Sequence, residues 1–162
     1  MSSSCNARVW KLTTSDNQVF NVKENMAVMS ETIKLMVENG VAGGEIPLPN
    51  VDGPTMAKII EWWKMHTIYG INLNVDAETN RGELKAWEAC FLDVDTHVLF
   101  DLIMATDYLN IHDLFERACQ KAAQLFICKS PEDIRILFGI PNDFTPEEER
   151  RIHMENAWAL EI

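Results

Sequence analysis

The stretch DTHVLFDLIMATDYLNIHDLFERACQKAAQLF, residues 95–126, decides the fold. Between Val98 and Leu109 it has only three plainly polar residues, Asp101, Thr106 and Asp107. A helix that apolar is expected to be covered on more than one side. Asn110 is expected to act as a cap. After it, a second helix keeps one apolar face, with Leu114, Ala118, Ala122 and Leu125/Phe126. We predict a helical hairpin in the middle of the fold.

Length and charge limit the classes of protein and partner. The chain of 162 residues can form one domain, or one domain with an extension, and can bury a core without disulfides or metal. Its 25 acidic and 14 basic residues give a net charge of −11, which repels phosphate and argues against nucleic acid and membrane partners. The N-terminus lacks the apolar core of a signal peptide, and no apolar run approaches the roughly 20 residues of a membrane span. A cytoplasmic and nuclear protein is expected.

Cysteine and histidine offer little support for catalysis or metal binding. The four cysteines are scattered without a CxxC pair, so they are expected to be core thiols in a reducing compartment. No histidine lies at zinc-ligand spacing, and no nucleotide-binding or hydrolase motif occurs. Cys90 and His97 could pair as nucleophile and base, but a packed thiol and a solvated imidazole are favoured. No enzyme activity, metal or cofactor is predicted.

The N-terminal part predicts a small sheet followed by helices. Residues 8–22 are predicted to form a β-hairpin, and residues 26–29 a helical turn. Ser30 is predicted to cap a helix that ends at residues 39–40. Residues 45–49 are an edge strand because of their prolines. Asp52 is predicted to cap a longer helix. A long loop is predicted over residues 69–82, and a short helix over residues 86–92. The fold class is α+β.

The C-terminal third repeats one pattern of helix start. Ser130-Pro131 and Thr145-Pro146 each place a hydroxyl cap, a proline and then acidic residues, and Gly139 ends the first helix. Thr145 and Glu148 have capping-box spacing. The segment is rich in large apolar residues, namely Phe138, Ile140, Phe144, Ile152 and Trp158. The residues alone leave two readings open: a core packed on the hairpin, or an exposed surface that binds a protein partner.

Several segments, taken in order, resemble one family. They are 46–51 (IPLPNV), 60–62 (IEW), 91–92 (FL), 99–103 (LFDLI), 107–111 (DYLNI), 131–135 (PEDIR), 138–149 (FGIPNDFTPEEE) and 155–158 (ENAW). Together they cover nearly the whole chain, and it is the ordered set that is specific. The chain resembles the S-phase kinase-associated protein 1 family, the adaptors of SCF cullin–RING ubiquitin ligases.

The resemblance implies a BTB/POZ domain over residues 6–128 and a two-helix C-terminal extension over 129–162. It implies no catalysis and no cofactor. Such adaptors hold an F-box protein, which selects the substrate, and dock it on the N-terminal domain of a cullin. An alternative is an F-box-binding structural subunit of a non-ligase assembly without cullin.

The resemblance also assigns residues to the two partners. Asp107 and Tyr108 would bind the cullin, although Asp107 departs from the usual asparagine. The F-box protein would be bound by Leu99, Ile103, Cys119, Phe138, Ile140, Asn156 and Trp158. The departure at Asp107 and smaller ones elsewhere suggest a divergent member or a paralogue.

Overall fold

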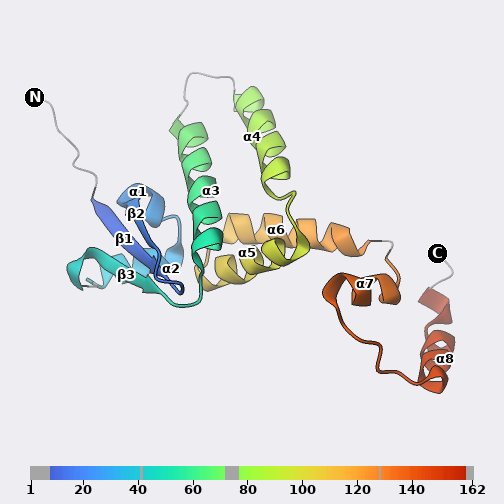
Figure 1. Ribbon diagram of the computed structural model, residues 1–162. Coiled ribbons are helices and arrows are strands. Elements are labelled where there is room, and N and C mark those ends of the chain that lie inside the picture. The colour runs from blue at the N-terminus through green and yellow to red at the C-terminus, as the bar shows by residue number, and fades with distance from the viewer. Residues whose placement is uncertain (1–7, 41, 72–76, 128, 160–162) are drawn as a thin grey trace, which may run out of the picture. The chain divides into compact units, whose positions relative to one another are not determined.

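The computed structural model describes residues 8–40, 42–71, 77–127 and 129–159 (Figure 1). The chain forms two compact units, Met1–Leu125 and Phe126–Ile162. The first unit contains β1 (Val9–Thr14), β2 (Val19–Lys23), α1 (Glu24–Ala27), α2 (Glu31–Glu38), the 3-10 turn η1 (Ala42–Gly44), β3 (Glu45–Leu48), α3 (Gly53–Ile71), α4 (Ala77–Phe91), α5 (Thr96–Tyr108) and α6 (His112–Phe126). The second contains α7 (Pro131–Phe138), α8 (Pro146–Glu155) and η2 (Ala157–Ala159).

The sheet has three strands in the order β2-β1-β3. β1 pairs antiparallel with β2, as a hairpin turned at Asn17, whose φ is 61°. β3 pairs parallel with β1 and lies at the sheet edge, where Pro47 removes no needed hydrogen bond. The predicted hairpin and edge strand are therefore confirmed, and with the many helices they confirm the α+β class.

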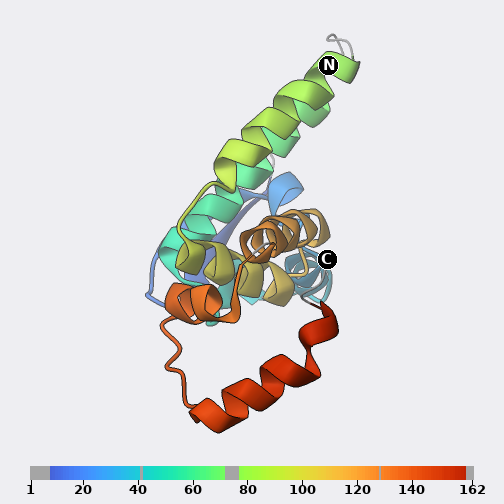
Figure 2. The ribbon, with the colours of Figure 1, turned by 90° about the vertical axis from the view of Figure 1, so that its right-hand side faces the viewer.

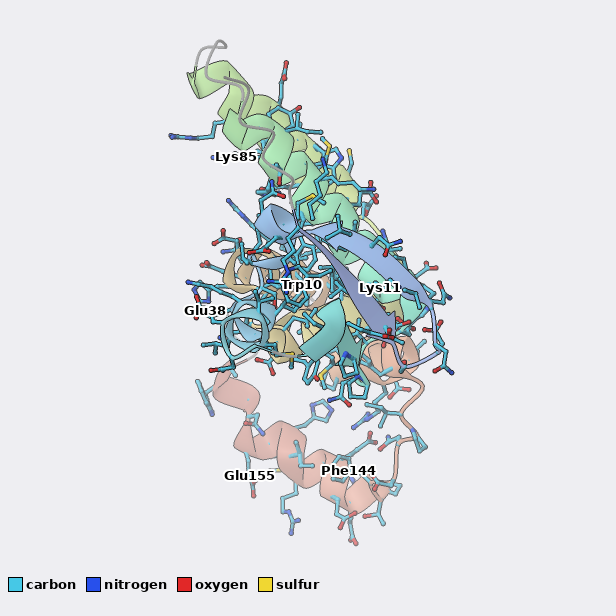
Figure 3. The ribbon with its side chains drawn as sticks, turned by 90° about the vertical axis from the view of Figure 1, so that its left-hand side faces the viewer. Trp10, Lys11, Glu38, Lys85, Phe144 and Glu155 are labelled. Carbon is cyan, nitrogen blue, oxygen red and sulfur yellow. The ribbon has the colours of Figure 1, made fainter. Side chains whose placement is uncertain are left out.

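One face of the sheet supplies the core of the first unit. Trp10, Leu12 and Val22 alternate along the hairpin and are almost fully buried, whereas Val9 and Lys11 are exposed on the other face. Figure 3 shows Trp10 pointing into the helical side and Lys11 on the strands. Burying large apolar side chains contributes about 1.5–3 kcal/mol each, so this core is a main source of stability for the first unit.

The expected loop at 69–82 is wrong over its described part. Tyr69 belongs to the last turn of α3, and α4 already begins at Ala77, so the two helices run side by side (Figures 1 and 2). The first half of α4 contains Thr79, Asn80 and Gly82 and has no apolar period, and for these reasons the sequence predicted a loop there. The later half packs on α3: the rings of Trp87 and Phe91 lie 5.9 and 5.6 Å from that of Trp62.

The predicted helical hairpin is confirmed as α5 and α6. Its first helix, however, is buried on one side only: Leu99, Leu102 and Thr106 are fully buried, whereas Met104 is 70% exposed. Asn110 lies just past the end of α5 with φ 51°, in the left-handed conformation that ends helices. Near the hairpin, Cys90 is exposed and not packed as expected. No helix among the described residues is both long and apolar enough to cross a membrane.

Candidate protein-interaction surfaces

Helix α7 begins at a reciprocal cap. The Ser130 hydroxyl accepts from the Asp133 N–H at 3.1 Å, and the Asp133 carboxylate accepts from the Ser130 N–H at 3.0 Å. Hydrogen bonds from Ser130, the hydroxyl first, hold the pKa of Asp133 below its ordinary value. Gly139, with φ 62°, ends the helix. The predicted start and end are confirmed.

Helix α8 begins in the same way. The Thr145 hydroxyl accepts from the Glu148 N–H at 3.3 Å, while the Thr145 N–H donates to the Glu148 carboxylate at 2.9 Å. This backbone bond, followed by the Thr145 hydroxyl, lowers the pKa of Glu148. The predicted capping box is confirmed. Both helices of the second unit thus have starts fixed by their own sequence.

Arg135 connects α7 to the segment and helix that follow. Its Nη1 lies 3.0 Å from Glu132 Oε2 and 3.9 Å from Glu149 Oε1, and its guanidinium lies 5.6 Å from the centre of the Phe144 ring. Asn142 Nδ2 donates to the same Glu149 oxygen at 2.7 Å. The Arg135 side chain is only 19% exposed. These polar and cation–π contacts hold α7 to the start of α8.

The second unit has no core among its described residues. None of the described residues in 126–159 is buried. Nine large apolar side chains there are at least 36% exposed: Ile127, Ile136, Leu137, Phe138, Ile140, Phe144, Ile152, Met154 and Trp158. Soluble monomers rarely leave so much apolar surface together, and such surfaces mark protein-binding sites. Within the second unit, these side chains therefore form a candidate protein-binding surface.

A hollow of about 350 Å³ lies within this second unit. Figure 2 shows α7 and α8 joined by an extended segment. The hollow is lined from α7 by Pro131 and Arg135, from the connection by Phe144, and from α8 by Ile152. Its wall is mainly apolar. A concave apolar surface with a few polar groups at its border is suited to an inserted apolar side chain.

The predicted F-box residues of the second unit are exposed. Phe138 is 37% exposed and stacks on Phe126 with ring centres 5.8 Å apart. Ile140 and Trp158 are 54% and 76% exposed. Asn156 ends α8, where its Nδ2 donates to the Ile152 carbonyl at 2.8 Å. These side chains are available to a partner, and Asn156 also fixes the turn that presents Trp158.

The predicted F-box residues of the first unit differ in accessibility. Ile103 and Cys119 are half-buried. Leu99 has no exposed surface, so in this conformation it belongs to the core and cannot contact a partner. Because most residues of this helix are apolar, the sequence alone did not indicate whether the Leu99 side chain faces the core or the solvent.

Asp107 and Tyr108 are the last residues of α5. Asp107 is exposed and Tyr108 is half-buried. The Thr32 hydroxyl donates to the Tyr108 carbonyl at 3.1 Å, which fixes this end of the helix to α2. Met104, one turn earlier, is exposed on the same helix and was missed by the sequence reasoning. Its spacing from Asp107 and Tyr108, at i+3 and i+4, is the signal that could have found it.

In the second unit, Ile136 and Met154 were missed as well. They are 72% and 80% exposed. Both lie in short amphipathic helices, where apolar residues off the main apolar face are a sequence signal for a second contact surface. The described part of the chain brings no three His, Cys, Asp or Glu side chains together around a metal position.

The family comparisons agree with this architecture. The model of the Skp1 family tetramerisation domain, of the POZ type, matches residues 8–67, and that of the Skp1 family dimerisation domain matches residues 112–159. The chain belongs to the Skp1 family. The resemblance found in the sequence is thereby confirmed, and the first match confirms the expected BTB/POZ-like fold.

Relatives match over almost their whole length. SKP1-like protein 1A of Arabidopsis thaliana is 43% identical over 153 residues, which cover 93% of this chain and 96% of the relative. SKP1-like protein 4 of the same plant is 43% identical over 154 residues, covering 93% and 94%. SKP1-like protein 1 of Oryza sativa subsp. japonica is 40% identical over 162 residues, covering 93% and 94%.

Proposed function

We propose that this Skp1-family protein is a non-catalytic adaptor of an SCF-type ubiquitin ligase. It links an F-box substrate receptor to a cullin and acts in the cytoplasm and nucleus. The observation that carries the proposal is the second unit, whose described residues form two well-capped helices without one buried side chain. Because folding requires burial of apolar area, a partner must supply the missing core.

The F-box segment is the proposed partner of the second unit. Phe138, Ile140 and Trp158 offer aromatic and branched side chains of the kind that dominate binding energy at interfaces. The apolar hollow beside Phe144 receives a side chain of that segment. Ile103 and Cys119 are offered by the first unit to the same partner. A permanent interface of this type buries about 2,000 Å² or more.

The cullin is the proposed partner of the end of α5. Asp107, Tyr108 and the exposed Met104 lie on one rigid helix, packed through Leu102 and Thr106 into the core. A surface on a rigid element presents fixed geometry to a scaffold. The adaptor thereby holds the substrate receptor at a fixed distance from the ubiquitin-transfer machinery, which raises the effective concentration of the substrate there.

Reconstitution tests this function. The full chain is mixed with an F-box segment, then with a cullin N-terminal domain, and analysed by size-exclusion chromatography with light scattering. We expect a 1:1 complex with the F-box segment and a ternary complex with both. Absence of either complex at micromolar concentration contradicts the adaptor function. Binding of F-box segments but of no cullin would instead favour the non-ligase assembly, which family membership does not favour.

A further inference from the structure

A groove whose lining includes none of the residues assigned to the two proposed partners runs between α4 and α6 of the first unit. It has a volume of about 330 Å³. From α4 and the residue just after it come Lys85, Glu88, Ala89 and Leu92, and from α6 come Arg117, Gln120, Lys121 and Gln124. Both sets recur at helical spacings of three and four, so each helix presents one continuous stripe to the groove.

The charge of this groove is opposite to that of the chain. Its lining has three cations, Lys85, Arg117 and Lys121, and one carboxylate, Glu88, in a protein of net charge −11. Lys85 is exposed and has no ion-pair partner among the described residues. Lys121 has only a 3.4 Å contact, with the highly exposed Asp93. The groove is therefore a local positive site on an acidic surface.

The carboxylate of Glu88 in the groove is already balanced by the charge of a neighbouring side chain, Arg117. Glu88 is 8% exposed; its Oε1 lies 3.2 Å from His66 Nε2, and its Oε2 lies 3.4 Å from Arg117 Nε. The His66 ring stacks on Trp62 with centres 4.1 Å apart, and its Nδ1 lies 3.0 Å from the Trp62 carbonyl oxygen. This framework fixes Arg117 through its Nε, while its two Nη nitrogens have no hydrogen-bond partner in the described part of the chain.

The remaining groups of the groove fit a peptide. The exposed amides of Gln120 and Gln124 can donate to and accept from a peptide backbone, and Ala89 leaves room beside them. The seven residue steps of α6 from Arg117 to Gln124 rise about 10 Å, which is the length of about three extended residues. Carboxylates on such a segment match the two lysines and the Nη nitrogens of Arg117, whose charge is already balanced by that of Glu88.

The groove and the F-box residue of α6 lie on opposite sides of the helix. At 100° per residue, as 3.6 residues per turn require, Cys119 points about 150° away from the middle of the stripe formed by Arg117, Gln120, Lys121 and Gln124. A ligand in the groove therefore does not occupy the side of α6 that carries Cys119.

We propose that the α4–α6 groove binds a short acidic peptide segment of a third protein. Arg117, Lys121 and Lys85 contact its carboxylates, and Gln120 and Gln124 contact its backbone. The contact would add a partner to the adaptor, and it uses none of the residues that are proposed to bind the F-box segment or the cullin.

Fluorescence anisotropy with the full chain tests the groove directly. The probe is a labelled, capped pentapeptide of glutamate and aspartate, and the comparison probes are its lysine counterpart, inorganic phosphate as competitor and a single-stranded RNA oligonucleotide. We expect saturable binding of the acidic peptide that weakens with added salt. Because three ionic contacts are involved, the double variant Lys85→Glu/Lys121→Glu is expected to weaken binding by about tenfold or more.

Lys11→Glu is the control for reversal of a lysine charge outside the groove. Lys11 is an exposed lysine on the sheet, away from Lys85 (Figure 3), so its reversal changes the net charge but not the groove. All three substitutions are at surface side chains, and thermal melting checks that the variants remain folded. Equal loss of binding in the control, no binding of the acidic peptide at low salt, or tighter binding of phosphate or RNA overturns the proposal. F-box binding by the double variant stays unchanged, so the result is independent of the adaptor function.

Discussion

The Ser30 hydroxyl donates a buried hydrogen bond to the carbonyl of Leu109, 79 residues later in the chain. The same oxygen accepts from the Ile33 N–H at 3.1 Å and so caps α2. The N–H groups of Glu31 and Thr32 point to the carbonyls of Asn110 and Leu109. The N-terminus of α2 thus receives the C-terminal carbonyls of α5, a favourable arrangement of two helix dipoles.

Ser30→Ala is expected to lower the free energy of unfolding by about 2 kcal/mol, because it removes a cap and leaves the buried Leu109 carbonyl with only the longer bond from the Thr32 N–H, at 3.4 Å. Urea denaturation followed by circular dichroism measures the change. Thr32→Val is the comparison: the substitution removes only the part-buried bond from the Thr32 hydroxyl to the Tyr108 carbonyl, keeps the backbone N–H, and should cost less than about 1.5 kcal/mol. Equal losses of stability in the two variants would show that capping α2 and bonding the Leu109 carbonyl at the same time gives Ser30 no additional contribution to stability.

Trp63 is fully buried, and its indole N–H has no hydrogen-bond partner among the described residues. Trp63→Phe removes this donor and keeps most of the apolar volume. We expect stability to remain unchanged or to rise by about 1 kcal/mol, whereas Trp63→Ala should lose about 3–5 kcal/mol. Trp10→Phe is the matched control, because the Trp10 indole donates to Glu24 Oε2 at 3.2 Å and that bond would be lost. A larger loss for Trp63→Phe than for Trp10→Phe contradicts the prediction.

The sequence was sufficient for local signals. Hydroxyl caps at Ser30, Ser130 and Thr145 predicted three helix starts that the structure bears out. Alternation in the first hairpin and the prolines of β3 predicted strands and the sheet edge. These features depend on bonds between residues a few positions apart, and local chemistry is enough to specify them.

The incorrect predictions concern features that depend on tertiary contacts. The expected loop at 69–82 was wrong because a polar helix needs no apolar period where it projects from the core. Leu99 and Met104 are both apolar residues of α5, yet one is fully buried and the other 70% exposed. Helical spacing separates their faces, but only packing of neighbouring elements decides which face is covered.

The second unit is expected to loosen in acid. The pKa values of Asp133 and Glu148 are lowered in the folded state, by hydrogen bonds from Ser130 and Thr145 respectively. The caps therefore stabilise their helices fully above the ordinary value, 4.5 for Glu148, and lose this contribution as the pH falls through the lower folded value. Amide chemical shifts of the two caps, followed by NMR from pH 6 downward, measure the transition.

Glu148→Gln supplies the control for that titration. Glutamine can still accept the Thr145 N–H but does not titrate, so the shift of the α8 cap should disappear while that of the α7 cap at Asp133 remains. An unchanged titration at the α8 cap would mean that another group produces it.

Arg135 is expected to position the proposed F-box surface. Arg135→Met keeps an unbranched, flexible side chain, which is shorter and uncharged, and removes the contacts with Glu132, Glu149 and the Phe144 ring. We expect faster hydrogen exchange in residues 140–149 and F-box affinity lower by about three- to tenfold, consistent with about 1 kcal/mol for such contacts. Arg151→Met is the control, because Arg151 is exposed and makes no ion pair among the described residues. Similar loss in both variants would point to net charge as the cause.

Trp158 and Tyr108 allow the two partner surfaces to be separated. Trp158 is 76% exposed in η2 of the second unit, and Tyr108 is half-buried at the end of α5 in the first. Trp158→Ala is expected to weaken F-box binding by about 2 kcal/mol, typical of an aromatic anchor, and to leave cullin binding unchanged. Tyr108→Lys is expected to do the reverse.

Isothermal titration of each variant with an F-box segment and with a cullin N-terminal domain measures both affinities. Asp107→Asn belongs in the same series, because it removes one exposed charge next to Tyr108 at nearly constant shape. If Asp107 weakens cullin binding, the asparagine variant gains affinity; if this chain binds a cullin that prefers the charge, the variant loses it. Loss of both partners in Trp158→Ala or in Tyr108→Lys would reveal unfolding and would refute two independent surfaces.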